Sequence, residues 1–180
     1  MDNVHSEMQF QVTYQGMINL SACFKQMTLE LETESADFLT MKRVVFTAKT
    51  DAIETQQASQ YRYQYIMNRL NSEEHPQVHF EGINWRLQGK SLLLQGNLTI
   101  HGITQPLTVA LKQKGVFADA FTGIKAGFKV EAIISRKAFH LNWNGAWEHG
   151  REVIGDTITI RAEILLIGKF KWKTACHQKN

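Results

Sequence analysis

The stretch from Leu92 to Leu111 alternates between apolar and polar residues with a period of two. Its apolar side comprises Leu92, Leu94, Leu98, Ile100, Leu107, Val109 and Leu111, with Gly96 in the same row. The alternation breaks at 101–106, and Pro106 is expected at a strand start because it has no N–H group for a ladder. The pattern predicts a hairpin of two long strands with one buried face. A single hairpin is marginal in water, so the rest of the chain must supply more sheet.

The same alternation returns along most of the chain. It is found at 4–14, 27–31, 44–48, 78–80, 126–134 and 157–166. Residues 55–72 differ, because they contain no Gly or Pro and their apolar residues recur at helical spacing, which predicts one helix over about 59–71. Residues 135–155 are of mixed polarity and contain glycines, so a loop is expected there.

About eight strands of this length would leave exposed edges in a flat sheet, and closure into a barrel removes such edges. The sequence therefore predicts an all-β fold, an extended antiparallel eight-stranded barrel with one helical insert. At 180 residues the chain is interpreted as a single domain spanning 1–180.

The composition narrows the functional classes. Hydrophobic residues make up 43% and charged residues 21% of the chain, which favours a large core over disorder. The net charge of +3 is too small to suggest nucleic-acid binding, and no apolar run reaches membrane-spanning length. Cys23 and Cys176 are expected to be unpaired thiols. No signal peptide is recognised, so the expected location is the cytoplasm, or the periplasm if a leader was removed.

The inward-facing rows decide what such a barrel can hold. An eight-stranded barrel is either filled by its own side chains or holds one small ligand. Bulky residues in these rows are Phe10, Phe46, Phe80 and Phe128. Small ones are Ser6, Ala48, Gly96, Ala126, Ala132 and Ala162. The small residues leave volume for an apolar ligand unless the large residues opposite fill it, and the pattern alone leaves both interpretations open.

Catalytic and metal-binding motifs are weak in this sequence. The seven histidines show no metal-ligand spacing, so no metal site is expected. There is no Gly-x-Ser-x-Gly sequence and no Gly-rich phosphate loop. These observations argue against an enzyme.

Three separated motifs resemble the YceI-like family of lipocalin-fold polyisoprenoid-binding proteins. The first is residues 2–12 (DNVHSEMQFQV), and the second is 96–107 (GNLTIHGITQPL). The third combines Gly127-Phe128, 134–143 (ISRKAFHLNW) and 153–156 (VIGD). The resemblance implies a lipocalin-like barrel with an apolar pore that binds a long isoprenoid or similar lipid, often as a homodimer, without a reaction.

The segment between Thr55 and His75 departs from that family's pattern. The family usually carries Arg-Asp, His-Leu and Phe-Phe-Asp there, where this chain has Gln60-Tyr61, Tyr63-Gln64 and 69–71 (RLN). Aromatic and amide groups thus replace charged ones. A pyrophosphate head group is therefore not implied, and a neutral one such as a quinone ring or an amide is at least as consistent with the sequence.

We therefore expect non-enzymatic carriage or sequestration of an isoprenoid, quinone or fatty-acid-like lipid, with no other cofactor. The expected pore wall comprises Phe10, Val12, Met27, Leu29, Phe46, Phe80, Leu98, Ile100, Phe128, Val130, Ile160 and Ile164. The expected pore mouth comprises Tyr61, Tyr63, Tyr65 and Trp143. The alternatives are an enzyme acting on a lipid-like substrate at the mouth, and a plugged barrel that serves as an interaction module.

Overall fold

The chain folds almost entirely into antiparallel β-structure in a computed structural model that describes residues 1–33, 41–55, 70–89, 91–119, 123–142 and 153–168. The strands are β1 (Glu7–Tyr14), β2 (Ile18–Phe24), β3 (Met27–Thr33), β4 (Met41–Lys49), β5 (Ile53–Thr55), β6 (Gln77–Gln88), β7 (Ser91–Ile100), β8 (Ile103–Asp119), β9 (Gly123–Ser135) and β10 (Ile154–Gly168). A short 3-10 helix, η2 (Lys137–Phe139), follows β9. Within the described residues, no helix has the length and apolar character needed to span a membrane.

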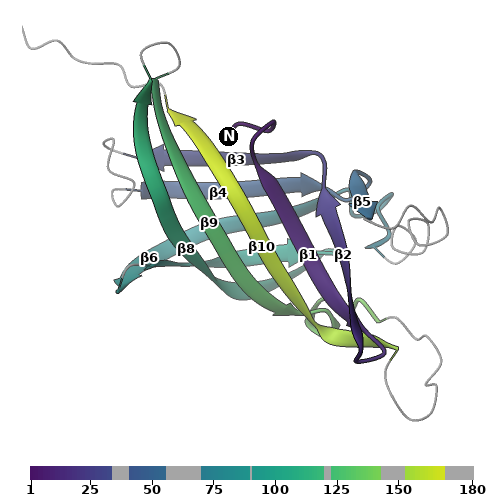
Figure 1. Cartoon of the computed structure of the whole chain (residues 1–180). Helices are drawn as coiled ribbons and strands as arrows, with labels where there is room; N and C mark the ends of the chain where they lie inside the picture. Colours follow the sequence, from purple (N-terminus) through teal and green to yellow (C-terminus); the bar gives the residue numbers. More distant parts are fainter. Residues whose placement is uncertain (34–40, 56–69, 90, 120–122, 143–152, 169–180) are drawn as a thin grey trace, which may run out of the picture.

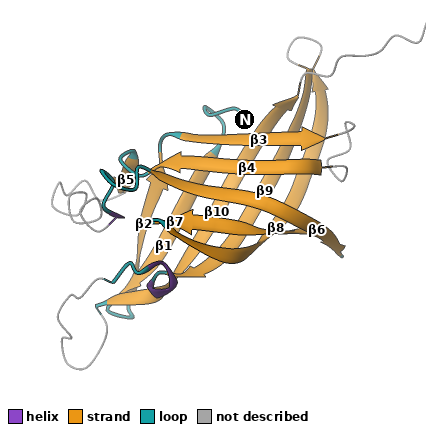
Figure 2. Cartoon of the chain, turned by 180° about the vertical axis from the view of Figure 1, so that it is seen from behind, coloured by secondary structure: helices purple, strands orange, loops and turns teal. Residues whose placement is uncertain are grey.

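All the described strands belong to one strongly curled sheet (Figure 1). Their order is β3-β4-β6-β7-β8-β9-β10-β1-β2-β5, and every neighbouring pair is antiparallel. The view from behind shows β3 and β4 crossing over the concave side that β8, β9, β10 and β1 form (Figure 2). The predicted all-β barrel architecture is confirmed.

The sheet contains ten strands where eight were expected, and the difference comes from one corner. There β2 bends into β3, and β4 bends into β5. The ladder continues through the bend, because Lys25 N–H donates to the Ala52 carbonyl (2.7 Å) and Lys49 N–H donates to the Gln26 carbonyl (2.9 Å). Counted as two bent strands, these four segments give the eight strands of the barrel. Corners of this kind let a sheet close on itself.

The central hairpin is confirmed, but its turn is tighter than expected. Ile100 pairs directly with Ile103, so β8 already includes Thr104, Gln105 and Pro106. His101 (φ 52°) and Gly102 (φ 72°) form the two-residue connection. Positive φ at both central positions is typical of a type I′ turn, whose twist matches that of the flanking strands. A histidine at a left-handed position is an uncommon turn signal, which is why a longer break was expected.

Other differences concern element limits. The first strand begins at Glu7 rather than at residue 4, and β2 was not expected, although its apolar residues alternate cleanly with Asn19, Ser21 and Cys23. The predicted loop over 135–155 contains η2, and β10 begins before its end, at Ile154. The helix predicted over about 59–71 falls almost wholly on residues 56–69, which lie outside the described part of the chain.

Candidate functional site

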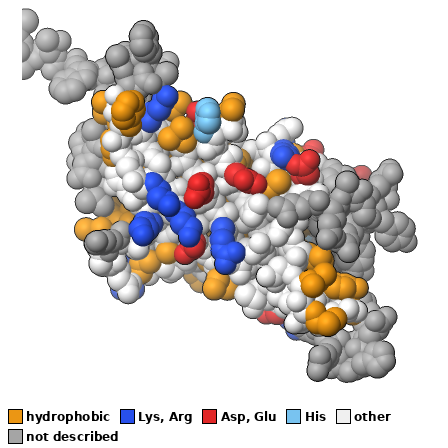
Figure 3. Space-filling model, viewed as in Figure 1, with side chains coloured by type: hydrophobic (Ala, Val, Ile, Leu, Met, Phe, Trp, Pro, Cys, Tyr) orange, Lys and Arg blue, Asp and Glu red, His pale blue; other side chains and the backbone are white. Residues whose placement is uncertain are grey.

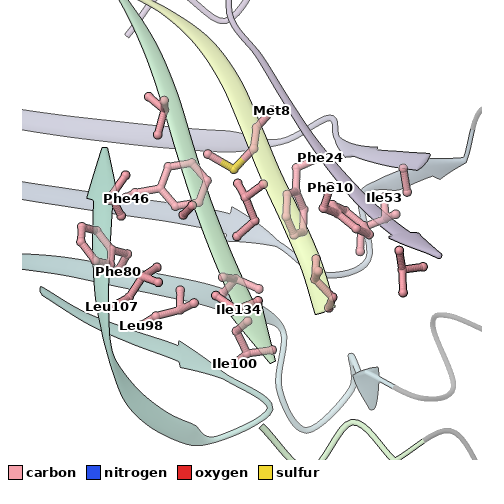
Figure 4. Close-up of a pocket in the computed structure, with 18 of the residues that line it drawn as sticks. Met8, Phe10, Phe24, Phe46, Ile53, Phe80, Leu98, Ile100, Leu107 and Ile134 are labelled. Atoms are coloured by element: carbon pink, nitrogen blue, oxygen red, sulfur yellow. The ribbon is translucent and has the colours of Figure 1, made fainter. Parts of the chain in front are cut away.

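The curled sheet encloses a cavity of about 440 Å³. Every one of the ten strands contributes at least one inward-facing side chain to its wall, because the period-two alternation repeats in each strand. Figure 4 shows aromatic and aliphatic side chains from opposite walls pointing toward one another across this space. The rings of Phe10 and Phe24 lie 5.3 Å apart at a tilt of 44° and cover one part of the wall. The interior is therefore apolar but incompletely filled.

Most of the expected pore-wall residues lie on this cavity. Those that line it are Phe10, Val12, Leu29, Phe46, Phe80, Leu98, Ile100, Phe128, Val130, Ile160 and Ile164. Met27 is buried in the core beside the corner but is not part of the lining. The expected mouth residues Tyr61, Tyr63, Tyr65 and Trp143 lie outside the described residues. That these side chains bind a ligand stays a prediction.

Leu20, Ala22 and Phe24 also line the cavity, although they were not among the expected site residues. They belong to β2, and the alternation of apolar and polar residues in that strand was the available signal.

Small inward-facing residues do not all create space. Gly96 lies under the Phe80 ring, and a Cβ atom at Gly96 would come within 2.6 Å of the Phe80 Cζ atom. Ala126 is completely buried in a packed cluster with Ile164 and Leu166. Ala132, on the same strand as Ala126, does line the cavity. Some of the predicted volume is thus used for packing, and the rest is open.

Polar groups are few among the residues of the lining. Asn19 and Ser21 hydrogen bond with Thr13 (3.3 Å) and Gln11 (3.1 Å) of β1, on the outward side of the sheet. Tyr14 and Thr55 belong to inward rows, at the end of the barrel where the β1–β2 hairpin and β5 lie. No Asp, Glu, His, Lys or Arg lines the cavity in the described residues. Its chemistry is therefore that of an apolar container with uncharged polar groups toward one end.

Groups capable of chemistry lie elsewhere. The rings of His75 and His101 pack edge to face, with 4.7 Å between their centroids. The described residues contain no group of three or more His, Cys, Asp or Glu side chains that could hold a metal ion. Burial raises the pKa of the Cys23 thiol, and an elevated thiol pKa disfavours the reactive thiolate.

A buried network of hydrogen-bonded polar groups, which we call the Arg136 network, stabilises the connection from β9 to β10. The Arg136 guanidinium is almost completely buried and donates to the carbonyl oxygens of Leu141 (2.8 Å), Ile154 (2.9 Å) and Gly155 (3.0 Å). Asp156 accepts hydrogen bonds from the Ser135 hydroxyl (2.7 Å) and the Lys137 backbone N–H (3.0 Å).

Two effects oppose each other at the Asp156 carboxylate. Burial alone would raise its pKa, but the hydrogen bonds from Ser135 and Lys137 and the charges of Lys137 and Arg136 outweigh burial and lower the pKa. The residues of the Arg136 network were not among the site residues predicted from the sequence, although the network adjoins Leu141 and Ile154 of the cavity wall.

The family model described as a YceI-like domain matches residues 1–166 of this chain. The chain belongs to the YceI-like family. Protein YceI of Salmonella arizonae is 29% identical over 141 residues, which cover 76% of this chain and 71% of that protein. The family resemblance of the three sequence motifs is thereby confirmed.

Solved structures share the fold of this YceI-like chain. BcnA of Burkholderia cenocepacia superposes with a TM-score of 0.76 at 16% identity, over 92% of this chain and 98% of that chain. A polyisoprenoid binding domain from Saccharophagus degradans superposes with a TM-score of 0.63 at 11% identity, over 93% and 97% of the two chains. At these identities the likeness establishes the shared fold.

Proposed function

We propose that this protein binds the long apolar tail of a lipid inside the barrel and carries or sequesters it without chemical change. The observation that carries the proposal is the open cavity of about 440 Å³ with an uncharged apolar wall. Ligand pockets are commonly about 300–1,000 Å³ and mostly apolar, so this cavity falls within the usual range. The family membership and the structural likeness to a polyisoprenoid binding domain support the same conclusion.

Burial of apolar area is sufficient to hold such a ligand. Removal of a few hundred Å² of hydrocarbon from water contributes several kcal/mol at about 25 cal/mol per Å². The wall offers aliphatic and aromatic surface from all ten strands. Affinity then depends on the length of the tail and its fit to the cavity, with little need for specific polar contacts.

The polar end of the cavity suggests how the ligand is oriented. Tyr14 and Thr55 supply hydroxyl groups near the β1–β2 hairpin and β5, whereas the wall toward Leu31 and Leu166 is apolar. An uncharged head group such as a quinone ring or an amide would meet hydrogen-bonding partners at the first end. We therefore propose an isoprenoid, quinone or fatty-acid-like lipid whose tail extends toward β3 and β10.

A catalytic role has less support. General acid–base catalysis needs a titratable side chain within hydrogen-bond reach of the reacting group. The described lining contains only hydroxyl and amide side chains as polar groups. Binding without turnover is the function that this wall supports.

The test is recovery of the lipid from purified protein by native mass spectrometry and by organic extraction. Leu98 lines the cavity on β7, so Leu98→Trp is expected to fill the space and to abolish the co-purifying lipid. Leu93→Trp is the matched control, because Leu93 lies on the same strand but is not part of the lining. Lipid recovered equally from both variants, or no lipid from the wild-type protein in several expression hosts, would contradict the proposal.

A further inference from the structure

One end of β8, β9 and β10 projects beyond the neighbouring strands of the sheet (Figure 1). The pairing of β8 with β7 ends at Leu111, whereas β8 continues to Asp119 and pairs with β9 alone in this part. At about 3.3 Å per residue the extension is roughly 25 Å long. The final residues of β10 run beside β9, where Ile167 is opposite Lys125. We call this projecting part of β8, β9 and β10 the arm.

The arm carries apolar side chains that no described residue covers. Phe117 is 67% exposed and lies opposite Lys125, which in turn lies opposite the partly exposed Ile167. The next row contains the pair Gly115 and Gly127, which have no side chains. Figure 3 shows hydrophobic side chains at the upper end of this face, where β8 and β10 end, next to a basic side chain. Phe117 and Ile167 are thus exposed apolar side chains on either side of Lys125, next to a row that contains two glycines.

Lys112, Lys114, Lys125 and Lys129 lie on the two strands of the β8–β9 hairpin, where Asp119 ends β8 and Glu163 of β10 lies opposite Lys129. The sequence from Gly82 to Ala118 contains no Asp or Glu, and β9 contains none before Glu131. Lys112 and Lys114 are exposed on β8. Glu131 lies further from the tip and forms an ion pair with Lys129 (2.9 Å).

We propose that the arm docks the protein on an anionic phospholipid surface. An exposed aromatic ring flanked by aliphatic residues and lysines suits the boundary between acyl chains and charged head groups, where rings insert and cations approach phosphates. The excess of lysines over acidic residues on β8 and β9 favours a negatively charged partner. Docking would bring a lipid carrier to a membrane, but the binding itself does not depend on what the cavity holds.

The opposite end of the barrel provides a matched control. Met17, at the β1–β2 hairpin tip, is 74% exposed and is followed by the exposed Ile18. No Lys or Arg lies between residues 1 and 24. If exposed apolar area were sufficient, this tip would bind a membrane as well as the arm does.

The experiment is co-sedimentation of the full chain with phosphatidylcholine vesicles, with and without phosphatidylglycerol, at low and high salt. The wild-type protein is expected to sediment only with the anionic vesicles and to be released by salt. Phe117→Ser is expected to weaken binding roughly tenfold through lost apolar burial. Lys112→Gln with Lys114→Gln is expected to weaken it about fivefold per lysine and to reduce the salt dependence. Met17→Ser should bind like the wild type.

Several results would overturn the inference. One is equal binding to neutral and anionic vesicles, and another is an equal loss in Met17→Ser. Absence of vesicle binding would mean that the lysines only protect a strand edge. A dimer that Phe117→Ser dissociates, without vesicle binding, would assign the surface to contact between copies of the chain. Lipid extraction from the same variants separates this test from the proposed function, because arm variants should keep their cavity lipid.

Discussion

The cavity and the Arg136 network are two parts of the same interior that depend on different interactions. In the cavity, apolar side chains face an open space and leave about 440 Å³ unfilled. In the Arg136 network, three nitrogen atoms of one guanidinium each donate a hydrogen bond to a backbone carbonyl oxygen within 3.0 Å. The difference shows where the barrel needs a unique structure. Directional hydrogen bonds fix the β9–β10 connection, whereas non-directional apolar burial allows a varied occupant.

The largest expected effect on stability comes from disrupting the Arg136 network. Arg136→Met removes the donors and leaves the carbonyl oxygens of Leu141, Ile154 and Gly155 without these partners, which should destabilise the protein by about 3 kcal/mol. Arg161→Met is the control, because Arg161 is exposed and its guanidinium donates to the Gln11 side chain. That change should stay within about 0.5 kcal/mol. Urea unfolding curves measure both stability changes, and similar midpoints for the two variants would show that the Arg136 network contributes little to stability.

A matched pair on β9 sharpens the contrast between filled and open interior. Ala126 has no exposed surface in a packed cluster, whereas Ala132 faces the cavity six residues further along the same strand. Ala126→Leu should destabilise the protein by about 1–3 kcal/mol through overpacking. Ala132→Leu should change stability by less than about 0.5 kcal/mol, because the added methyl groups enter open space. Thermal unfolding of lipid-free protein is the measurement, and equal losses would indicate a collapsed interior.

A smaller effect on stability concerns the Asp156 carboxylate of the Arg136 network. The folded-state pKa of Asp156 lies below its ordinary value of 3.8, so ionised Asp156 stabilises the folded state. This stabilisation is fully present above the pKa of the unfolded chain and is lost as pH falls through the lower folded-state pKa. The stability difference between the wild type and Asp156→Asn should therefore be largest at neutral pH and shrink below about pH 4. Urea midpoints at several pH values test this, and a difference independent of pH would contradict it.

The alternation of residues predicted most of the barrel, and the errors have identifiable causes. The inward rows of β7, β9 and β10 were predicted correctly, because side chains of a strand can only point to one face or the other. The turn at His101 was misplaced because left-handed backbone there depends on its partner Gly102 and on strand twist. The corner at Lys25 and Gln26 has no local signal, since it exists only where two strands bend together.

The sequence by itself determined the class of fold, the family, and which side chains face inward. Only the tertiary structure decided where those inward side chains meet and where they do not. Gly96 and Ala132 are both small inward residues, yet Phe80 covers the first and open space adjoins the second. Strand tilt, stagger and the bent corner together set the distance across the barrel. That distance is a property of all strands at once, so no single stretch of sequence encodes it.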